Sequence, residues 1–256
     1  MRSHFRILKR MGYVRDQEGI MNRYLREKNG WDYHLSKTRE FINTSFAGTS
    51  IESVAVLGSG WLLDVPLEDM LARYQTIYLV DIYHPPQVRK KAGPLKQVKL
   101  IEADLTGGAI EQIWQTYLEK GLHSIDHLLN MITLSNPIPH LSPGAVISVN
   151  LINQLDIQLT EFIEKKSRIS GEDLRPFRHL IQKFHLDWIS RTPGCLVTDT
   201  VEINVDRHGE VSNKSLLYAE LPDGLRSGGW IWEFDTHGTY LAETLTRMEV
   251  QAIEWG

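Results

Sequence analysis

Residues 54–66, Val-Ala-Val-Leu-Gly-Ser-Gly-Trp-Leu-Leu-Asp-Val-Pro, decide the fold. Four apolar residues run into a Gly-x-Gly turn, which is typical of a buried parallel strand that must turn sharply at its end. Asp64 and Pro66 then predict the start of a helix, because a carboxylate suits the N-cap and proline loses no hydrogen bond in the first turn. The stretch predicts a strand–turn–helix unit whose turn leaves backbone N–H groups open for an anion.

Further strand-like segments follow, and amphipathic helical patterns separate several of them. The predicted strands are 53–57, 76–80, 98–103, 145–149, 195–203, 230–234 and 248–255. Helices are predicted over 64–74, 110–118, 174–188 and 214–220. Strands that alternate with helices build parallel sheets. The predicted fold class is therefore α/β: a Rossmann-like, mostly parallel seven-stranded sheet with helices on both faces and an antiparallel C-terminal strand.

The choice of the fourth strand sets the domain organisation. Residues 126–133 compete with 145–149 for this place, and the later segment keeps the strand count consistent. This choice leaves 122–142 as an insertion, predicted as a helix followed by a proline-punctuated loop. Residues 51–256 then form the main domain, and residues 1–50 form an N-terminal helical cap or lid.

The N-terminal region combines basic charge with helical periodicity. Residues 1–15 contain no acid but five basic side chains: Arg2, Arg6, Lys9, Arg10 and Arg15. This pattern favours a solvated basic helix end or arm, with a nucleic-acid contact or a targeting segment as the alternatives. Apolar residues between 16 and 46 recur at near-helical spacing, broken around Asn29-Gly30, which predicts one or two helices.

Composition narrows the class of protein. The chain has 256 residues, a formal net charge of −4 and one cysteine, Cys195. A lone cysteine excludes an intramolecular disulfide and favours a reducing compartment. No apolar run approaches the roughly 20 residues that a membrane span needs. We expect a soluble cytoplasmic protein without a membrane partner, and the sequence makes no prediction of its oligomeric state.

Polar residues follow three of the predicted parallel strands: Asp81, Asp104 and Asn150. Ligands of open α/β sheets bind beyond the carboxyl ends of the strands. Asp81 lies 23 residues after Gly58 (81 − 58) and suits a ribose diol, because one carboxylate can accept from two hydroxyls. Leu63 stands where a dinucleotide fingerprint needs its third glycine. A nucleoside with a small charged tail therefore fits better than NAD or FAD.

This set of features resembles the class I S-adenosylmethionine-dependent methyltransferases over about residues 50–256. The resemblance rests on 56–60, 80–82 and 103–105, and the segments 62–67 and 148–155 look like those of a poorly characterised bacterial subgroup. The turn departs from the family pattern, since it lacks the frequent third glycine and an acid before the first. The resemblance implies S-adenosylmethionine as cofactor and methyl transfer as the reaction, with a small molecule as the expected acceptor.

The resemblance also assigns roles to individual residues. Gly58, Ser59 and Gly60 would pack against the methionine part of the cofactor. Asp81 with Ile82 would hold the ribose, Asp104 with Leu105 the adenine, and Asn150 would lie beside the methyl donor. For Asp81 the alternative is a solvent-exposed carboxylate, and for Asp104 it is a plain N-cap of the next helix.

Candidate acceptor contacts come from two places in the chain. Asn150, Asn153 and Gln154 follow the fourth strand, and Trp31, Tyr33 and His34 join them if the N-terminal helices fold back as a lid. In-line methyl transfer depends mainly on positioning, so a base is needed only where the nucleophile must lose a proton. Asn150 and His34 are the candidate catalytic residues. His34 is the candidate base, and its alternative is a histidine that packs the lid.

Several remaining signals support weaker interpretations. His123 and His127 have the i, i+4 spacing of zinc ligands but lack a third ligand, so no metal is expected. Trp230 and Trp232 alternate on a strand and are interpreted as sheet packing first and a substrate platform second. A second basic cluster motivates an RNA methyltransferase as the nearest competing function: Arg89, Lys90, Lys91, Lys96 and Lys99. A nucleotide-dependent oxidoreductase and a non-catalytic nucleotide-binding protein are two further competing functions.

Overall fold

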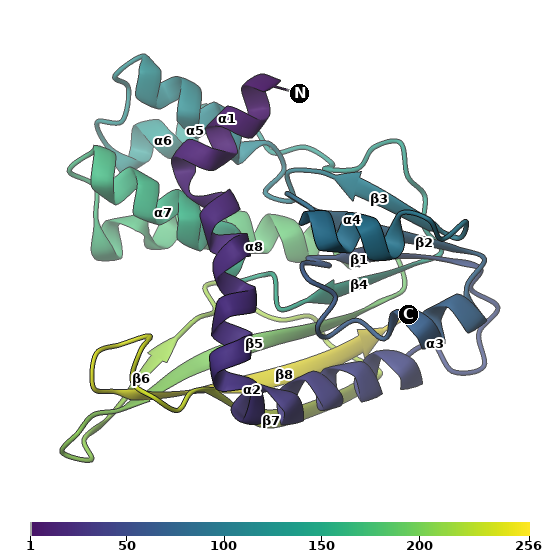
Figure 1. Cartoon of the computed structure of the whole chain (residues 1–256). Helices are drawn as coiled ribbons and strands as arrows, with labels where there is room; N and C mark the ends of the chain where they lie inside the picture. Colours follow the sequence, from purple (N-terminus) through teal and green to yellow (C-terminus); the bar gives the residue numbers. More distant parts are fainter. Residues whose placement is uncertain (1) are drawn as a thin grey trace.

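The computed structural model describes residues 2–256, with side chains from His4 onward. Within these residues eight strands form one sheet in the order β3-β2-β1-β4-β5-β8-β7, and β6 pairs with β5 (Figure 1). The strands are β1 (Ser53–Leu57), β2 (Thr76–Asp81), β3 (Val98–Glu102), β4 (Ala145–Val149), β5 (Gly194–Val205), β6 (Val211–Ser215), β7 (Arg226–Asp235) and β8 (Leu245–Trp255). Strands β1 to β5 pair in parallel, whereas β8 is antiparallel to both β5 and β7. The predicted fold class is confirmed.

The eighth strand corrects one prediction. Residues 214–220 were expected to form a short helix, but β5 continues to Val205 and pairs back with β6 as an antiparallel hairpin. The turn between them includes Gly209 at φ 81°, a conformation that glycine adopts without strain. Strand β6 is exposed along its whole length, and its backbone hydrogen bonds to β5 take the place of those of the predicted helix at residues 214 and 215.

The helices are α1 (Arg2–Met11), α2 (Tyr13–Thr44), α3 (Leu67–Arg73), α4 (Pro86–Ala92), α5 (Ala109–Leu118), α6 (Ile125–Met131), α7 (Gln154–Lys166) and α8 (Arg175–Ile189), with a 3₁₀ turn at Gly171–Leu174. The helix after the glycine turn begins at Leu67, with Pro66 at the N-cap position. The prediction that Asp64 caps this helix is wrong, because its carboxyl group accepts a hydrogen bond from Asn150 instead. Helix α7 was not predicted.

Two hydrophobic cores lie on opposite faces of the sheet. Ala55 and Leu57 of β1 belong to the core that α1, α5, α7 and α8 cover. Val54 and Val56 belong to the other core, covered by α3, α4 and the second half of α2. This alternation follows from the two-residue repeat of a strand buried on both faces. Helices therefore pack on both faces, as predicted.

Helix α2 connects the two cores. Tyr13 and Val14, at its start, belong to the first core, whereas Trp31 and the residues after it belong to the second. The helix therefore crosses the edge of the sheet, as Figure 1 shows in purple. It bends at Glu27 (φ −100°, ψ 19°), two residues before the predicted break at Asn29. The long helix thus covers the edge where the parallel strands end.

Helix α1 is a packed element. Ile7, Leu8 and Met11 are buried against the first core, while Arg6, Lys9 and Arg10 are exposed. The interpretation of a solvated basic helix agrees with this arrangement, although the side chain of Arg2 lies outside the described residues. A membrane-spanning segment would need a longer apolar helix than any found in residues 2–256.

Two glycines of α2 test how closely this helix packs on β7. A Cβ at Gly30 would lie 2.5 Å from the Glu233 carbonyl oxygen of β7, whereas a Cβ at Gly19 meets nothing within 4 Å. We expect Gly19→Ala to raise the free energy of unfolding by about 0.5–1 kcal/mol, because alanine restricts the unfolded chain. We expect Gly30→Ala to lower it by about 1–3 kcal/mol through overpacking. Urea denaturation of both variants measures the difference, and equal stabilisation by the two would contradict this packing.

Candidate functional site

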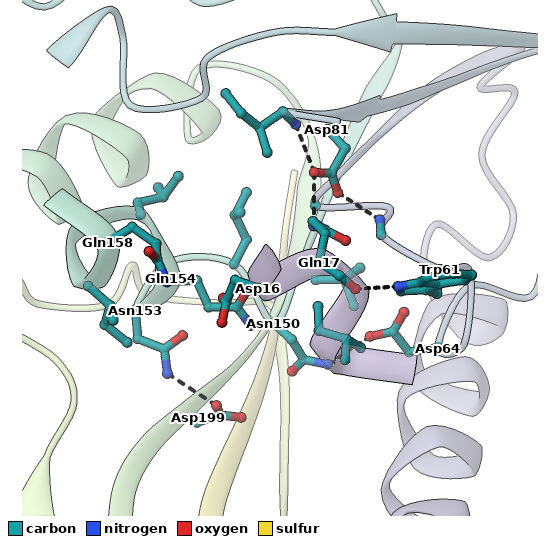
Figure 2. Close-up of a pocket in the computed structure, with 18 of the residues that line it drawn as sticks. Asp16, Gln17, Trp61, Asp64, Asp81, Asn150, Asn153, Gln154, Gln158 and Asp199 are labelled. Carbon is teal, nitrogen blue, oxygen red and sulfur yellow. Dashed lines mark hydrogen bonds between the residues drawn. The ribbon is translucent and has the colours of Figure 1, made fainter. Parts of the chain in front are cut away.

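A cavity of about 300 Å³ lies beyond the carboxyl ends of β1 to β4, where α2 crosses the sheet edge (Figure 2). Its volume is at the lower end of the range typical of small-molecule sites. The structure brings most of the predicted site residues to its wall: Gly58, Gly60, Asp81, Ile82, Asp104, Leu105, Asn150, Asn153, Gln154, Trp31 and His34. Residues far apart in the sequence therefore line one cavity.

Two predicted site residues do not line this cavity. Ser59, the middle residue of the glycine turn, is fully buried and is not among the residues that line the cavity. Tyr33 is 56% exposed, because one residue along a helix turns the side chain by about 100° away from its neighbour His34. The direct contacts predicted for these two side chains are not supported.

The glycine turn uses its backbone donors internally. Gly58 and Gly60 have φ values of 76° and 44°, and a Cβ at Gly58 would lie 2.9 Å from the Val149 carbonyl oxygen. The N–H groups of Gly58 and Ser59 donate to the Val80 carbonyl oxygen, and the N–H of Gly60 donates to Asp81 Oδ2 at 2.7 Å. The prediction that this turn leaves N–H groups open for an anion is therefore wrong for these three residues.

Asp81 joins the turn to the second strand and to α2. It is 5% exposed, and its Oδ1 accepts from the Ile82 N–H at 2.7 Å and from Gln17 Nε2 at 3.3 Å. Trp61 Nε1 donates to the Gln17 carbonyl oxygen at 2.6 Å, which fastens α2 to the loop after the turn. Burial raises the pKa of Asp81, while the hydrogen bonds oppose this shift. Gln17 was not predicted, because the sequence pattern does not show where α2 crosses the strand ends.

Asp104 is engaged with the start of α5. Its Oδ1 accepts from the N–H and hydroxyl of Thr106, and its Oδ2 lies 3.4 Å from the Ile110 nitrogen, which donates to it. These contacts match the alternative interpretation of a capping carboxylate. The carboxyl group still lines the cavity, where burial raises its pKa.

His34 is fully buried beside two tryptophans of β7. Its ring stacks on Trp232 with centroids 4.0 Å apart, and Trp230 Nε1 lies 3.1 Å from its Nδ1. Since an indole N–H can only donate, Nδ1 accepts and Nε2 carries the ring proton. Desolvation lowers the pKa of His34 to about 3, so the ring is neutral near pH 7. The protonated Nε2 lies 3.1 Å from the side-chain nitrogen of Asn150, and because both atoms are donors this contact is not a hydrogen bond.

Asn150 lies between this histidine and Asp64 and donates to the acid. Its backbone has φ 46°, a left-handed conformation that asparagine tolerates better than most residues. Its side-chain nitrogen lies 2.8 Å from Asp64 Oδ2. Burial raises the pKa of Asp64, and the nearby charge of Asp81 adds to this shift. The bond from Trp230 to His34 and the bond from Asn150 to Asp64 therefore each fix the orientation of polar groups beside the glycine turn.

The far end of the cavity holds two acids of β5 that were not predicted. Asp199 is 6% exposed, and its Oδ2 accepts from Asn153 Nδ2 at 3.1 Å. Glu202 is 5% exposed and accepts from Asn204 at 2.8 Å and from the Tyr240 hydroxyl at 3.4 Å. Burial, with the charges of Asp64 and Glu202, raises the pKa of Asp199 to about 6. Acids inside a strand predicted to be buried were the signal for these residues.

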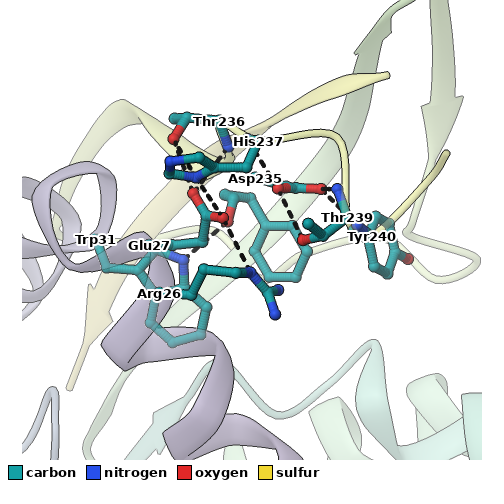
Figure 3. Close-up of polar contacts among 9 residues, drawn as sticks. Arg26, Glu27, Trp31, Asp235, Thr236, His237, Thr239 and Tyr240 are labelled. Atoms are coloured by element: carbon teal, nitrogen blue, oxygen red, sulfur yellow. Dashed lines mark hydrogen bonds and ion pairs between the residues drawn. The ribbon is translucent and has the colours of Figure 1, made fainter. Parts of the chain in front are cut away.

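The loop after β7 completes this end of the cavity. Glu27 of α2 accepts from the N–H and hydroxyl of Thr236 and contacts His237 Nδ1 at 2.8 Å (Figure 3). Asp235 accepts from the backbone N–H groups of His237, Thr239 and Tyr240. Because donors occupy these carboxylates, the cluster fastens the loop to α2. It thereby sets Tyr240 against Phe234, with ring centroids 5.0 Å apart.

Acidic groups dominate the charge of the cavity. Its lining contains one lysine or arginine, Arg23, and seven carboxyl groups: Asp16, Asp64, Asp81, Asp104, Glu161, Asp199 and Glu202. Among the side chains described, Glu161 is the one of these acids that forms an ion pair, with Lys165 at 2.9 Å. The cavity therefore favours a cationic ligand over an anionic one.

The chain was compared with protein families, curated proteins and solved structures. No protein-family model matches the chain, and no curated protein matches it. Among solved structures, it is similar to the glycopeptide N-methyltransferase MtfA complexed with S-adenosyl-L-homocysteine, with 14% identity and a TM-score of 0.33. That match covers 84% of this chain and 70% of the other. Such a remote likeness assigns neither a family nor an activity.

The raised pKa of Asp199 predicts a stability cost at neutral pH. The folded protein holds this proton up to about pH 6, whereas an unfolded aspartic acid loses it at about pH 4. The contribution of the group to stability is thus complete below about pH 4 and is lost as the pH rises to about 6. We expect Asp199→Asn to raise the free energy of unfolding by about 1–3 kcal/mol at pH 7.5 and much less at pH 4.

Urea denaturation at both pH values measures this effect. Asp187→Asn is the matched control, because Asp187 lies on α8 in an exposed pair with Lys183 and should change stability by no more than about 0.5 kcal/mol. A loss of stability in Asp199→Asn at pH 7.5 would contradict the account of a buried, poorly compensated charge.

Proposed function

We propose that the protein transfers a methyl group from S-adenosylmethionine to a small-molecule acceptor. The observation that carries this proposal is the bond from the Gly60 N–H to Asp81 at the carboxyl ends of β1 and β2. In dinucleotide-binding folds the N–H groups of this turn donate to a phosphate of the ligand. Here the Gly60 N–H donates to the carboxylate of Asp81 instead. The turn therefore favours a nucleoside ligand without phosphates.

The charge of the cavity supports the same cofactor. Dinucleotides carry anionic phosphates, which carboxyl groups at the wall would repel. The cavity has seven carboxyl groups and one arginine among its lining residues. A sulfonium cofactor is a cation and fits such a wall. These two features favour S-adenosylmethionine over NAD and thus favour a methyltransferase over an oxidoreductase.

The residues that would hold the cofactor line one side of the cavity. Gly58 and Gly60 would contact its methionine part, and Asp81 would accept from the ribose hydroxyls. Asp104, with Leu105, would lie against the adenine, although its carboxylate already accepts from Thr106. When bound, the cofactor supplies an electrophilic methyl group. The protein must then align the acceptor, exclude water and accommodate any proton that the acceptor releases.

Asn150 and His34 would position the acceptor beside the methyl donor. The lone pair of His34 Nδ1 is engaged by Trp230, and its Nε2 carries the proton. His34 therefore has no free lone pair to accept a proton, so we propose that its ring packs against Trp232 and supports the wall beside Asn150 in place of acting as a base. Asn153 and Gln154 would contact the acceptor further along the wall.

The first half of α2 would act as the lid. Gln17 donates to Asp81, the carboxylate that the ribose would need, and Trp61 holds the Gln17 backbone. Cofactor binding would therefore require Gln17 to move aside or to share Asp81 with a hydroxyl. This coupling would link the position of the N-terminal helices to occupancy of the cavity.

The alternative RNA substrate has less support. Arg89 pairs with Glu102, and Lys91 lies 4.0 Å from Glu68, so neighbouring acids offset part of the basic cluster. None of its five basic residues lines the cavity. A small acceptor therefore remains the better proposal, and RNA retention at low salt would favour the alternative.

Isothermal titration calorimetry with S-adenosylhomocysteine and NADH tests the cofactor. We expect S-adenosylhomocysteine to bind and NADH to give no measurable binding. Asp81→Asn should weaken S-adenosylhomocysteine at least tenfold, about 1.4 kcal/mol, because one of two acceptor oxygens is lost. Glu102→Gln is the control. Glu102 of β3 pairs in register with Asp81 of β2 but does not line the cavity. Unchanged affinity in Asp81→Asn would remove the proposed ribose site.

A further inference from the structure

Asp199 and Asn153 present unpaired oxygens at the far end of the cavity. Asp199 Oδ1 and Asn153 Oδ1 are buried and have no hydrogen-bond partner, although the two side chains bond to each other through their other atoms. Both residues line the cavity, and Figure 2 shows them together below Gln154. Buried polar atoms are rarely left unpaired, and both atoms are acceptors. The wall therefore lacks a donor that a ligand can supply.

Other buried acids have all of their donors within the protein: Asp81 and Asp235 accept from backbone N–H groups, and two further acids pair with arginines. Asp156, 1% exposed, pairs with Arg178 at 2.7 Å, and Glu27, 1% exposed, pairs with Arg26 at 3.3 Å. Asp199 and Glu202 have no such cation within 4.0 Å among the described side chains. A buried carboxylate without a cation is costly. The missing partner at this wall is thus a positive charge that can also donate hydrogen bonds.

Aromatic rings complete this end of the cavity. Trp232, Phe234 and Tyr240 line it beside the two acids. The guanidinium of Arg23 lies 5.4 Å from the centroid of Phe234 and 6.0 Å from that of Tyr240. Aromatic faces attract cations at such distances. The rings at this end of the cavity thus already contact one cation of the protein.

We propose that the methyl acceptor carries a protonated amine, which binds to Asp199 and Asn153 beside Glu202 and the aromatic rings. The role of this ligand as a methyl acceptor rests on the proposed methyltransferase function, whereas the cation site rests on the contacts alone. An ammonium group supplies three donors and a positive charge, and it satisfies both unpaired oxygens. A hydroxyl would supply a donor without the charge, and a carboxylate would be repelled. Asp199 is thereby a specificity-determining residue.

Calorimetry with matched small molecules tests this site. The probes are benzylamine, 2-phenylethylamine and tryptamine, with the alcohol and the carboxylate of the same ring system for each. Each is titrated into the full-length protein with and without saturating S-adenosylhomocysteine. We expect at least one amine to bind tenfold or more tightly than its alcohol, and the carboxylates to bind least. Failure of all three amines to bind, or equal binding of amine and alcohol, would overturn the proposal.

A variant of Asp199 tests whether this residue binds the amine. Asp199→Asn should weaken the amine at least tenfold and change the binding of its alcohol by less than twofold, because it keeps the shape and removes the charge. Asp187→Asn, an exposed acid on α8, should change neither. Thermal denaturation verifies that both variants are folded. Unchanged amine affinity in Asp199→Asn would overturn the assignment of this residue.

The two proposals fail separately. If amines bind through Asp199 but S-adenosylhomocysteine does not bind, the methyltransferase function fails and the cation site stands. If S-adenosylhomocysteine binds and Asp81→Asn weakens it, while no amine binds, the cofactor assignment stands and the amine acceptor fails.

Discussion

The hydrogen bond from the Gly60 N–H to the Asp81 carboxylate is the constraint on which the site depends. It joins the turn after β1 to the end of the neighbouring strand β2, so the two strand ends and the turn form one wall of the cavity. Because a side chain of the protein satisfies the turn, this wall has little affinity left for a phosphate. The negative charge of Asp81 also lies at the cavity wall, where it favours cationic ligands over anionic ones. One contact thus sets both the shape and the electrostatic character of the cavity.

Helix α2 turns this wall into an enclosed site. It is anchored in both cores, and between the anchors it crosses the strand ends, where Gln17 reaches Asp81 and His34 reaches Asn150. The close approach of Gly30 to β7 and the contacts of Glu27 with the loop after β7 hold the second half of the helix in place. The first half is held at the cavity by Trp61 and Gln17. One helix thus contacts both the glycine-turn end of the cavity and the end beside β7.

The sequence predicted the parts of the structure that depend on residues close together in the chain. Strands β1 and β4 were predicted at the bounds that they have, because buried strands are continuous apolar runs between turn residues. Asp81 and Asn150 were found because the carboxyl ends of parallel strands share one edge. Asp64 was misassigned as a cap, since its bond to Asn150 joins residues 86 positions apart. Gln17, Asp199 and Glu202 were missed for the same reason: their places depend on how α2 and β5 meet the cavity.

The unpaired acids connect the stability of the protein to its proposed chemistry. Carboxyl groups that are buried without a cation disfavour folding at neutral pH, and selection for stability alone would replace or pair them. Asp156 shows that the fold can supply an arginine to a buried acid where no ligand is needed. At Asp199 it supplies an asparagine, which leaves oxygens of both side chains unpaired. A ligand cation is the partner that offsets this cost, so its binding would be coupled to the stability of the sheet edge. Under the proposal of an amine ligand, the cost of burying Asp199 is thus offset when the ligand binds.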